Sequence, residues 1–311
     1  MEYSESSLKT LPNLFIVGAS KAGTTSLFHW LKSHPDFFFP TMKEVHYFSY
    51  HCIKNCSKGP GDKVVLSTIC NNFDQYEKIF SAGKGSLIRV DNSPSYLFYA
   101  ADTAKKIHDA VPDAKILIVL REPVEKIFSQ YSHLARQGRE VLDFETALSK
   151  ENERKQNGWG DMWRYKESGY YADSVETFID VFGRDKVKVC FFEQLRDAPS
   201  TFVSEVIEFS GANSEFSFNS GEVFNRSGTP KSLFVARYVL GGPVYSIAKK
   251  VFPAKLGGLI RRNLQKLNTG KKIVLADKVR QSLKQDYKDD INRLEEVLGL
   301  ESSHLSKRHG W

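Results

Sequence analysis

The chain has 311 residues, of which 41% are hydrophobic and 26% charged, and its formal net charge is +7 at pH 7. These values describe an ordinary soluble globular protein that is long enough to bury a sizeable core. No apolar run approaches the roughly 20 residues that cross a bilayer, and the polar, acidic residues 1–5 do not form a secretory signal. We therefore expect a cytoplasmic protein, or a soluble domain without its membrane anchor.

The first predicted elements are a strand, a glycine-containing loop and a helix. The apolar run 14–17 predicts a buried strand, and apolar spacing predicts a helix over 24–33. The loop between them, Gly18-Ala19-Ser20-Lys21-Ala22-Gly23-Thr24-Thr25, directs backbone N–H groups and a helix N-terminus at an anion. Loops that bind nucleoside triphosphates read G-x-x-x-x-G-K-[ST], but Thr24 stands in that lysine position and the lysine is Lys21. The loop therefore predicts a phosphate-bearing donor whose transferred group is not a metal-bound γ-phosphoryl.

The cysteines raise the question of a metal site. Three of the four lie near two histidines: Cys52, Cys56 and Cys70 beside His46 and His51. Because their spacing matches no standard zinc motif, we predict no metal site. Cys190 lies in an apolar run and is expected to be a buried core thiol.

Strands alternate with helices along the chain, which predicts an α/β fold. Further strands are predicted over 115–120 and 186–192, and further helices over 100–110, 123–136, 168–182, 200–210 and 275–298. We expect a single P-loop-like domain with a central, mostly parallel sheet flanked by helices. Its predicted parts are an α/β core (14–215), a basic and partly helical lid or acceptor segment (223–276) and a C-terminal helix (277–311).

The basic segment 223–276 carries eleven lysines and arginines and no acidic residue. Its charge of +11 exceeds the net +7, so the rest of the chain sums to −4. Such asymmetry predicts an anionic partner, either a cofactor, an acidic substrate or a membrane surface touched peripherally. A solvated basic face is the alternative, and we do not expect a nucleic-acid partner.

A cation follows the predicted strand 115–120. Arg121 is followed by Pro123, which suits the first turn of a helix, so Arg121 lies at a strand's carboxyl end in the expected ligand crevice. Enzymes that hydrolyse triphosphates often place a magnesium-binding aspartate there. Arg121 can instead bind phosphate directly, and Ser129, two helical turns further on, can face the same phosphate. An ion pair of Arg121 with Glu122 or Glu125 is the alternative.

These motifs resemble those of the sulfotransferases that use 3′-phosphoadenosine 5′-phosphosulfate. The loop 18–26 resembles their 5′-phosphosulfate loop, and the segment from Arg121 to Ser129 resembles their 3′-phosphate motif. Further similarity runs through 43–48, 91–96 and 168–171. The resemblance assigns donor binding to Ser20, Lys21, Ala22, Gly23, Thr24, Thr25, Ser26, Arg121, Ser129 and Tyr171, the last at a position that contacts adenine in several members.

Within that superfamily the chain is most similar to the heparan-sulfate type and its bacterial relatives. The resemblance implies that Glu44 is the catalytic base and that His133 is a secondary catalytic candidate. The Golgi enzymes carry a cysteine-bridged loop before a Lys-Gly-Arg stretch that binds the 3′-phosphate. Here the corresponding region has no cysteine, and its candidates for donor binding are Arg226, Ser227, Gly228 and Lys231.

The resemblance implies metal-independent, in-line transfer of a sulfuryl group to a hydroxyl or amine, with adenosine 3′,5′-bisphosphate as the product. Lys21 would neutralise charge on the leaving oxygen, and Glu44 would accept the proton. His46 shares a face with Glu44 along an extended segment and could orient the acceptor. Surface pairing of Glu44 with Lys43 or Lys21, and plain packing of His46, are the alternatives.

Acceptor identity is left open by the sequence. A carbohydrate or glycolipid is favoured, and a small-molecule natural product is the alternative. Two other functions also fit the loop: a P-loop kinase for a small molecule, and a non-catalytic module that binds a nucleotide or an anionic glycan. The positions of Thr24 and Arg121 disfavour the kinase, and the presence of both Lys21 and Glu44 disfavours the module.

Overall fold

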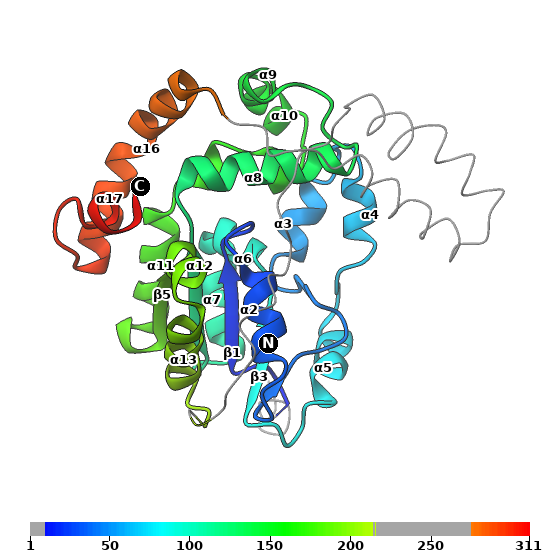
Figure 1. Cartoon of the computed structure of the whole chain (residues 1–311). Helices are drawn as coiled ribbons and strands as arrows, with labels where there is room; N and C mark the ends of the chain where they lie inside the picture. The colour runs from blue at the N-terminus through cyan, green and yellow to red at the C-terminus, as the bar shows by residue number, and fades with distance from the viewer. Residues whose placement is uncertain (1–9, 214, 216–274) are drawn as a thin grey trace.

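Five parallel strands form the central sheet, in the order β2-β3-β1-β4-β5 (Figure 1). The computed structural model describes residues 10–213, 215 and 275–311. The strands are β1 (Leu14–Gly18), β2 (Phe37–Phe38), β3 (Ile88–Asn92), β4 (Lys115–Leu120) and β5 (Val187–Phe191). After β1 the chain forms the edge strand β2 and returns to β3 on one side of β1, and it then crosses to β4 and β5 on the other side, so β1 is the point at which it changes sides. The carboxyl end of β1 is where such sheets bind their ligands.

Helices surround this sheet. They are α2 (Thr24–Leu31), α3 (Tyr50–Asn55), α4 (Asp62–Leu66), α5 (Phe73–Ser81), α6 (Ser95–Phe98), α7 (Ala100–Ala110), α8 (Pro123–Arg136), α9 (Phe144–Ser149), α10 (Glu151–Gln156), α11 (Ala172–Phe182), α12 (Phe192–Asp197), α13 (Pro199–Ser210), α16 (Asp277–Leu298) and α17 (His304–His309). Short 3-10 helices occupy Asp161–Trp163, Glu167–Gly169 and Arg184–Lys186. The predicted single α/β domain with a parallel sheet is confirmed.

Most predicted elements are found with small differences at their ends, and the helices over 100–110 and 123–136 agree fully. The helix predicted over 168–182 is wrong at its start, because α11 begins only at Ala172. The reason is tertiary. The Asp290 carboxylate on α16 accepts hydrogen bonds from the backbone N–H groups of Tyr171, at 2.7 Å, and Ala172, at 3.3 Å. It thereby caps α11 from a distant segment.

Two other differences concern strands and the C-terminus. The strand β3 was not predicted, because Arg89, Asp91 and Asn92 interrupt its apolar pattern. The predicted C-terminal helix over 277–311 is two helices, α16 and α17, separated by Gly299 in a left-handed conformation. Of the basic segment 223–276, all but the last two residues lie outside the described part of the chain, so its prediction as a lid is untested.

Helix α8 lies across the carboxyl end of β1 (Figure 1). It starts at Pro123, and the side chain of Glu122 caps it by accepting a hydrogen bond from the backbone N–H of Glu125 at 2.6 Å. Lys126 is fully buried below the helix, where its ammonium donates to the Gln130 side chain and to the Ser168 carbonyl, both at 2.8 Å. These bonds attach α8 to the segment that precedes α11.

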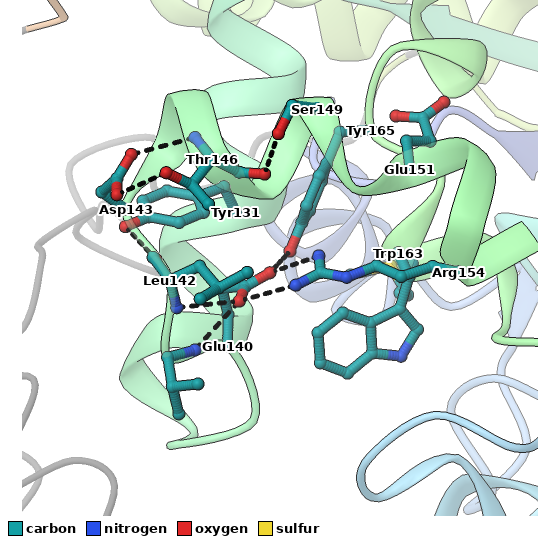
Figure 2. Close-up of polar contacts among 12 residues, drawn as sticks. Tyr131, Glu140, Leu142, Asp143, Thr146, Ser149, Glu151, Arg154, Trp163 and Tyr165 are labelled. Atoms are coloured by element: carbon teal, nitrogen blue, oxygen red, sulfur yellow. Dashed lines mark hydrogen bonds and ion pairs between the residues drawn. The ribbon is translucent and has the colours of Figure 1, made fainter.

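A buried ion pair holds the chain that leaves the end of α8. The Arg154 guanidinium on α10 points at the Glu140 carboxylate and bonds both of its oxygens, at 2.6 and 3.0 Å (Figure 2). The Tyr165 hydroxyl donates to the same carboxylate at 2.8 Å. Glu140 follows α8 by four residues, so this cluster ties the segment that leaves α8 to α10 and Tyr165.

Candidate active site

The loop between β1 and α2 requires glycine at its end. Gly23 precedes α2 with φ of 90°, a conformation that L-residues rarely adopt, and a Cβ there would lie 2.7 Å from the ring of Phe192. Phe192 opens α12, so the loop is packed against the end of β5. No acidic side chain lies in the first turn of α2, which leaves its N-terminus suited to an anion. Lys43 adds a cation, since its Nζ donates to Thr25 Oγ1 at 2.7 Å.

Arg121 connects the end of β4 to this loop. Its Nη1 donates to the carbonyl oxygen of Lys21 at 3.1 Å, and its guanidinium stacks 4.7 Å from the ring centroid of Phe192. The alternative ion pair is present in part, because Nη2 lies 3.5 Å from a Glu125 carboxylate oxygen. Arg280 on α16 binds the other oxygen of Glu125 at 2.7 Å. The Glu125 charge is therefore shared between two arginines.

The segment that carries Glu44 rests on a buried polar platform. The backbone N–H groups of Val45 and His46 both donate to Ser93 Oγ, at 3.1 and 2.9 Å, and Ser93 in turn donates to Asp91 at 2.5 Å. Tyr76 and Tyr96 also donate to Asp91, each at 2.9 Å. These bonds hold residues 45 and 46 in one conformation, with φ of 55° at His46.

Glu44 and His46 point toward one another. His46 Nε2 lies 3.5 Å from Glu44 Oε2, and Nδ1 bonds Ser95 Oγ at 2.6 Å. Lys43 Nζ lies 3.7 Å from the other Glu44 oxygen. The ion pair of Glu44 with Lys43, one of the alternatives to a catalytic role, is therefore present. Burial opposes ionisation of Glu44, but the hydrogen bond from His46 and the charges of His46, Lys43 and Lys21 outweigh it and lower the pKa to about 2. Glu44 is therefore a carboxylate at neutral pH.

Lys21 faces the same region. Burial, followed by the charges of Arg136 and Arg121, lowers the pKa of its ammonium to about 8, while the Glu44 carboxylate opposes the shift. His133 on α8 is affected by the same groups: burial and then the charges of Lys21 and Arg136 lower its pKa to about 3. His133 is thus neutral, and its Nε2 lies 3.0 Å from the Gln137 amide nitrogen.

A cavity of about 210 Å³ lies under the loop, between α6, α8 and α11. Ala19 and Ser20 of the loop form part of its wall, and Lys126, Gln130 and Tyr171 form another part. Tyr171 is buried, and its hydroxyl donates to the carbonyl oxygen of Arg121 at 3.0 Å. Its contact with adenine stays a prediction.

The structure thus brings together Lys21 of the loop, Glu44 and His46 of the 43–48 motif, and Arg121 and His133 of the segment that follows β4, three parts of the sequence that lie far apart. Ser129 lies half-buried on the same helix as His133. The candidates Arg226, Ser227, Gly228 and Lys231 lie outside the described residues. Sequence reasoning missed three contributors, namely Lys43, Arg136 and Phe192. Only Lys43 had a signal, because it opens the motif that contains Glu44.

The four cysteines are free thiols, and Cys190 is buried as expected. Within the described ranges there is no group of three or more histidine, cysteine or acidic side chains arranged to hold a metal ion. None of the helices described is both long and apolar enough to cross a membrane.

Comparison with known proteins assigns the family. Residues 11–226 match the family model described as the sulfotransferase domain. The chain therefore belongs to the sulfotransferase family and is an enzyme of that class, which confirms the family that its motifs indicated. It is similar to the crystal structure of a sulfotransferase from Alicyclobacillus acidocaldarius, with 32% sequence identity and a TM-score of 0.75 over 94% of this chain and 97% of that one.

Two of the curated relatives name a carbohydrate or heparan sulfate as what they act on. The bifunctional heparan sulfate N-deacetylase/N-sulfotransferase 1 of Mus musculus is 25% identical over 260 residues, which is 79% of this chain and 26% of that protein. Carbohydrate sulfotransferase 15 of Mus musculus is 26% identical over 166 residues, which is 44% of this chain and 30% of that protein. The matches thus span less than a third of the length of these two relatives.

Proposed function

We propose that the protein transfers a sulfuryl group from 3′-phosphoadenosine 5′-phosphosulfate to a hydroxyl or amine of a carbohydrate or glycolipid acceptor. The observation that carries the proposal is the convergence of Lys21, Glu44 and His133 beside the anion-binding loop. The hydrogen bond from Arg121 to the Lys21 carbonyl supports it, because it couples two predicted donor-binding elements.

The charges of the site fit such a donor. Lys21 lies in the loop, and Lys43 and Arg121 lie beside it. The negative charge of Glu44 raises the pKa of both Lys21 and His133, against the larger effects that lower them. The backbone N–H groups of 23–26 and the ammonium of Lys21 bind the 5′-phosphosulfate. Arg121 and Ser129 bind the 3′-phosphate, for which the guanidinium offers bidentate geometry.

In the reaction the acceptor oxygen or nitrogen forms a bond to sulfur while the bond from sulfur to the bridging oxygen breaks. The electron pair of that bond leaves with adenosine 3′,5′-bisphosphate, and Lys21 stabilises the charge that develops on the bridging oxygen. Glu44 accepts the acceptor proton. The neutral imidazole of His133 hydrogen-bonds the reacting groups, and His46 holds the Glu44 carboxylate in place.

With a pKa of about 2, the Glu44 carboxylate is a weak base. General bases work best when their pKa lies near the operating pH. In the free protein the low pKa of Glu44 arises from the hydrogen bond with His46 and from the charges of His46, Lys43 and Lys21, which outweigh burial. A bound donor brings negative charge next to Lys21, and this charge would raise the pKa of Glu44. The base is then strengthened when the donor is in place.

We infer the class of acceptor from the names of two relatives. Their names specify heparan sulfate and carbohydrate substrates, so a glycan hydroxyl or amine is favoured over a small natural product. A peripheral membrane contact through 223–276 stays a prediction, since all but two of those residues are outside the described chain.

The test is incorporation of label from sulfur-labelled donor into a panel of oligosaccharides, glycolipids and hydroxylated small molecules, with and without a chelator. We expect labelled product from at least one glycan and the same rate with chelator. Consumption of ATP in place of the sulfated donor would contradict the proposal in favour of a kinase, and product from natural products alone would contradict the glycan acceptor.

A further inference from the structure

Arg136, in the last turn of α8, has no acidic side chain paired with it among the residues that the structure describes. Its Nε is buried and has no hydrogen-bond partner, and no ion pair to Arg136 is found among the described residues. Burial lowers the pKa of its guanidinium, although an arginine remains charged at any working pH. Arg136 as a whole is half-buried, and a buried donor atom without a partner is costly, a cost that an anionic ligand bound to the guanidinium would offset.

Neighbouring arginines do not share this feature. Arg139, three residues further on, pairs with the Asp62 carboxylate and donates to the Pro60 carbonyl at 2.6 Å. Arg154 is paired with Glu140 (Figure 2). The guanidinium groups of Arg139 and Arg154 therefore each form an ion pair with a carboxylate of the protein. Of these three arginines, Arg136 alone has no such ion pair among the described residues.

The charge of Arg136 lowers the pKa of two residues of the candidate active site. After burial, it is the largest influence that lowers the pKa of Lys21, ahead of the charge of Arg121, and it also lowers the pKa of His133. Residues 129, 133 and 136 are spaced by four and three, which places them on one face of α8. Along that face the proposed 3′-phosphate ligands come first, His133 comes next, and Arg136 lies one turn beyond.

We propose that Arg136 binds a carboxylate or sulfate of the acceptor, so that the acceptor is an acidic sugar chain whose charge lies close to the reacting hydroxyl or amine. This inference rests on the proposed function. The 3′-phosphate of the donor is assigned to Arg121 and Ser129, toward the N-terminal end of that face, whereas Arg136 lies beyond His133 and acts on Lys21, where the acceptor has to meet the transferred group. A guanidinium fits a carboxylate or sulfate with two parallel hydrogen bonds.

The experiment measures binding to protein saturated with adenosine 3′,5′-bisphosphate, by calorimetry. One probe is a tetrasaccharide of alternating glucuronic acid and N-acetylglucosamine, and the other is the same tetrasaccharide with its carboxylates reduced to hydroxymethyl groups. We expect the wild type to bind the acidic form at least about tenfold more tightly, since one charge-assisted hydrogen bond accounts for that factor. Arg136→Gln should remove the difference and weaken binding of the bisphosphate much less than it weakens binding of the acidic probe.

Two controls make the result specific. Arg308→Gln changes an exposed arginine on α17 and should retain the full preference for the acidic probe. Arg136→Lys retains the charge without the planar fork and should retain part of the preference. It also replaces Arg136→Gln if that variant fails to fold.

Equal binding of the two probes by the wild type, or no binding of the acidic one, would overturn the inference. So would a variant at Arg136 that weakens bisphosphate binding as much as it weakens the acidic probe, because the arginine would then serve the donor. Failure of the wild type to bind the bisphosphate would instead overturn the proposed function, so the two failures are distinguishable.

Discussion

Arg121 and Lys21, one hundred residues apart in the chain, are joined by a hydrogen bond of 3.1 Å from the arginine Nη1 to the lysine carbonyl oxygen. This bond attaches the end of β4 to the loop after β1. The same guanidinium is stacked on Phe192, which also packs against Gly23. A single side chain thus contributes both to the shape of the loop and to the positive charge of the site.

Arg121→Ala should weaken the binding of adenosine 3′,5′-bisphosphate by about tenfold or more, because a charge-assisted hydrogen bond is lost. The loss for adenosine 5′-phosphate, which lacks the 3′-phosphate, should be much smaller. Calorimetry with both ligands checks this expectation. Equal losses would mean that Arg121 acts through the shape of the loop and does not contact the 3′-phosphate.

The second prediction concerns pH. The pKa of Lys21 is about 8 in the free protein, so its ammonium is charged below that pH and loses its proton above it. Bound phosphate favours the charged form and raises this pKa. Binding of the bisphosphate should therefore weaken above about pH 8 and be accompanied by proton uptake there, and calorimetry in buffers of different ionisation enthalpy measures that uptake.

Lys21→Arg provides the control for this pH dependence. An arginine stays charged throughout the range, so the variant should show no proton uptake at the same pH. Uptake that persists in Lys21→Arg would assign the titration to another group.

Glu44→Gln tests the catalytic base. The variant retains the size of the side chain but cannot accept the proton, so kcat should fall by about 10²–10⁴. Affinity for the bisphosphate should be unchanged or higher, since a negative charge near Lys21 is removed. Release of adenosine 3′,5′-bisphosphate from the donor provides the measurement, with the exposed Glu145→Gln on α9 as the matched variant. Turnover near that of the wild type would remove Glu44 as the base.

The cluster in Figure 2 predicts a stability effect. Glu140 and Arg154 are almost fully buried, with 1% and 7% of their side chains exposed. Glu140→Gln leaves the Arg154 charge without its partner, which should lower the free energy of unfolding by about 3–5 kcal/mol. Denaturant titration checks this value. Glu153→Gln, in the exposed pair with Lys150, should leave the midpoint nearly unchanged, and an equal loss there would show that burial is not the cause.

The sequence by itself determined the elements whose signals are local. The glycine loop lies between a strand and a helix, and Pro123 follows a strand that ends at Arg121, so neighbouring residues were enough to predict both anchors. The apolar periodicity of 100–110 and 123–136 predicted those helices to the residue, because each is long and amphipathic. These signals sufficed for the fold class and the family.

Only the tertiary structure decided which side chains meet. The start of α11 depends on Asp290 from a distant helix, and the conformation of Glu44 and His46 depends on Asp91 through Ser93. Arg136 and Arg139 look alike in the sequence, since Arg136 ends α8 and Arg139 follows it by three residues, yet Arg139 pairs with Asp62 and Arg136 has no acidic partner in the part of the chain that the structure describes. They differ because charge compensation depends on what the fold packs against each one, and this long-range packing leaves no local pattern in the chain.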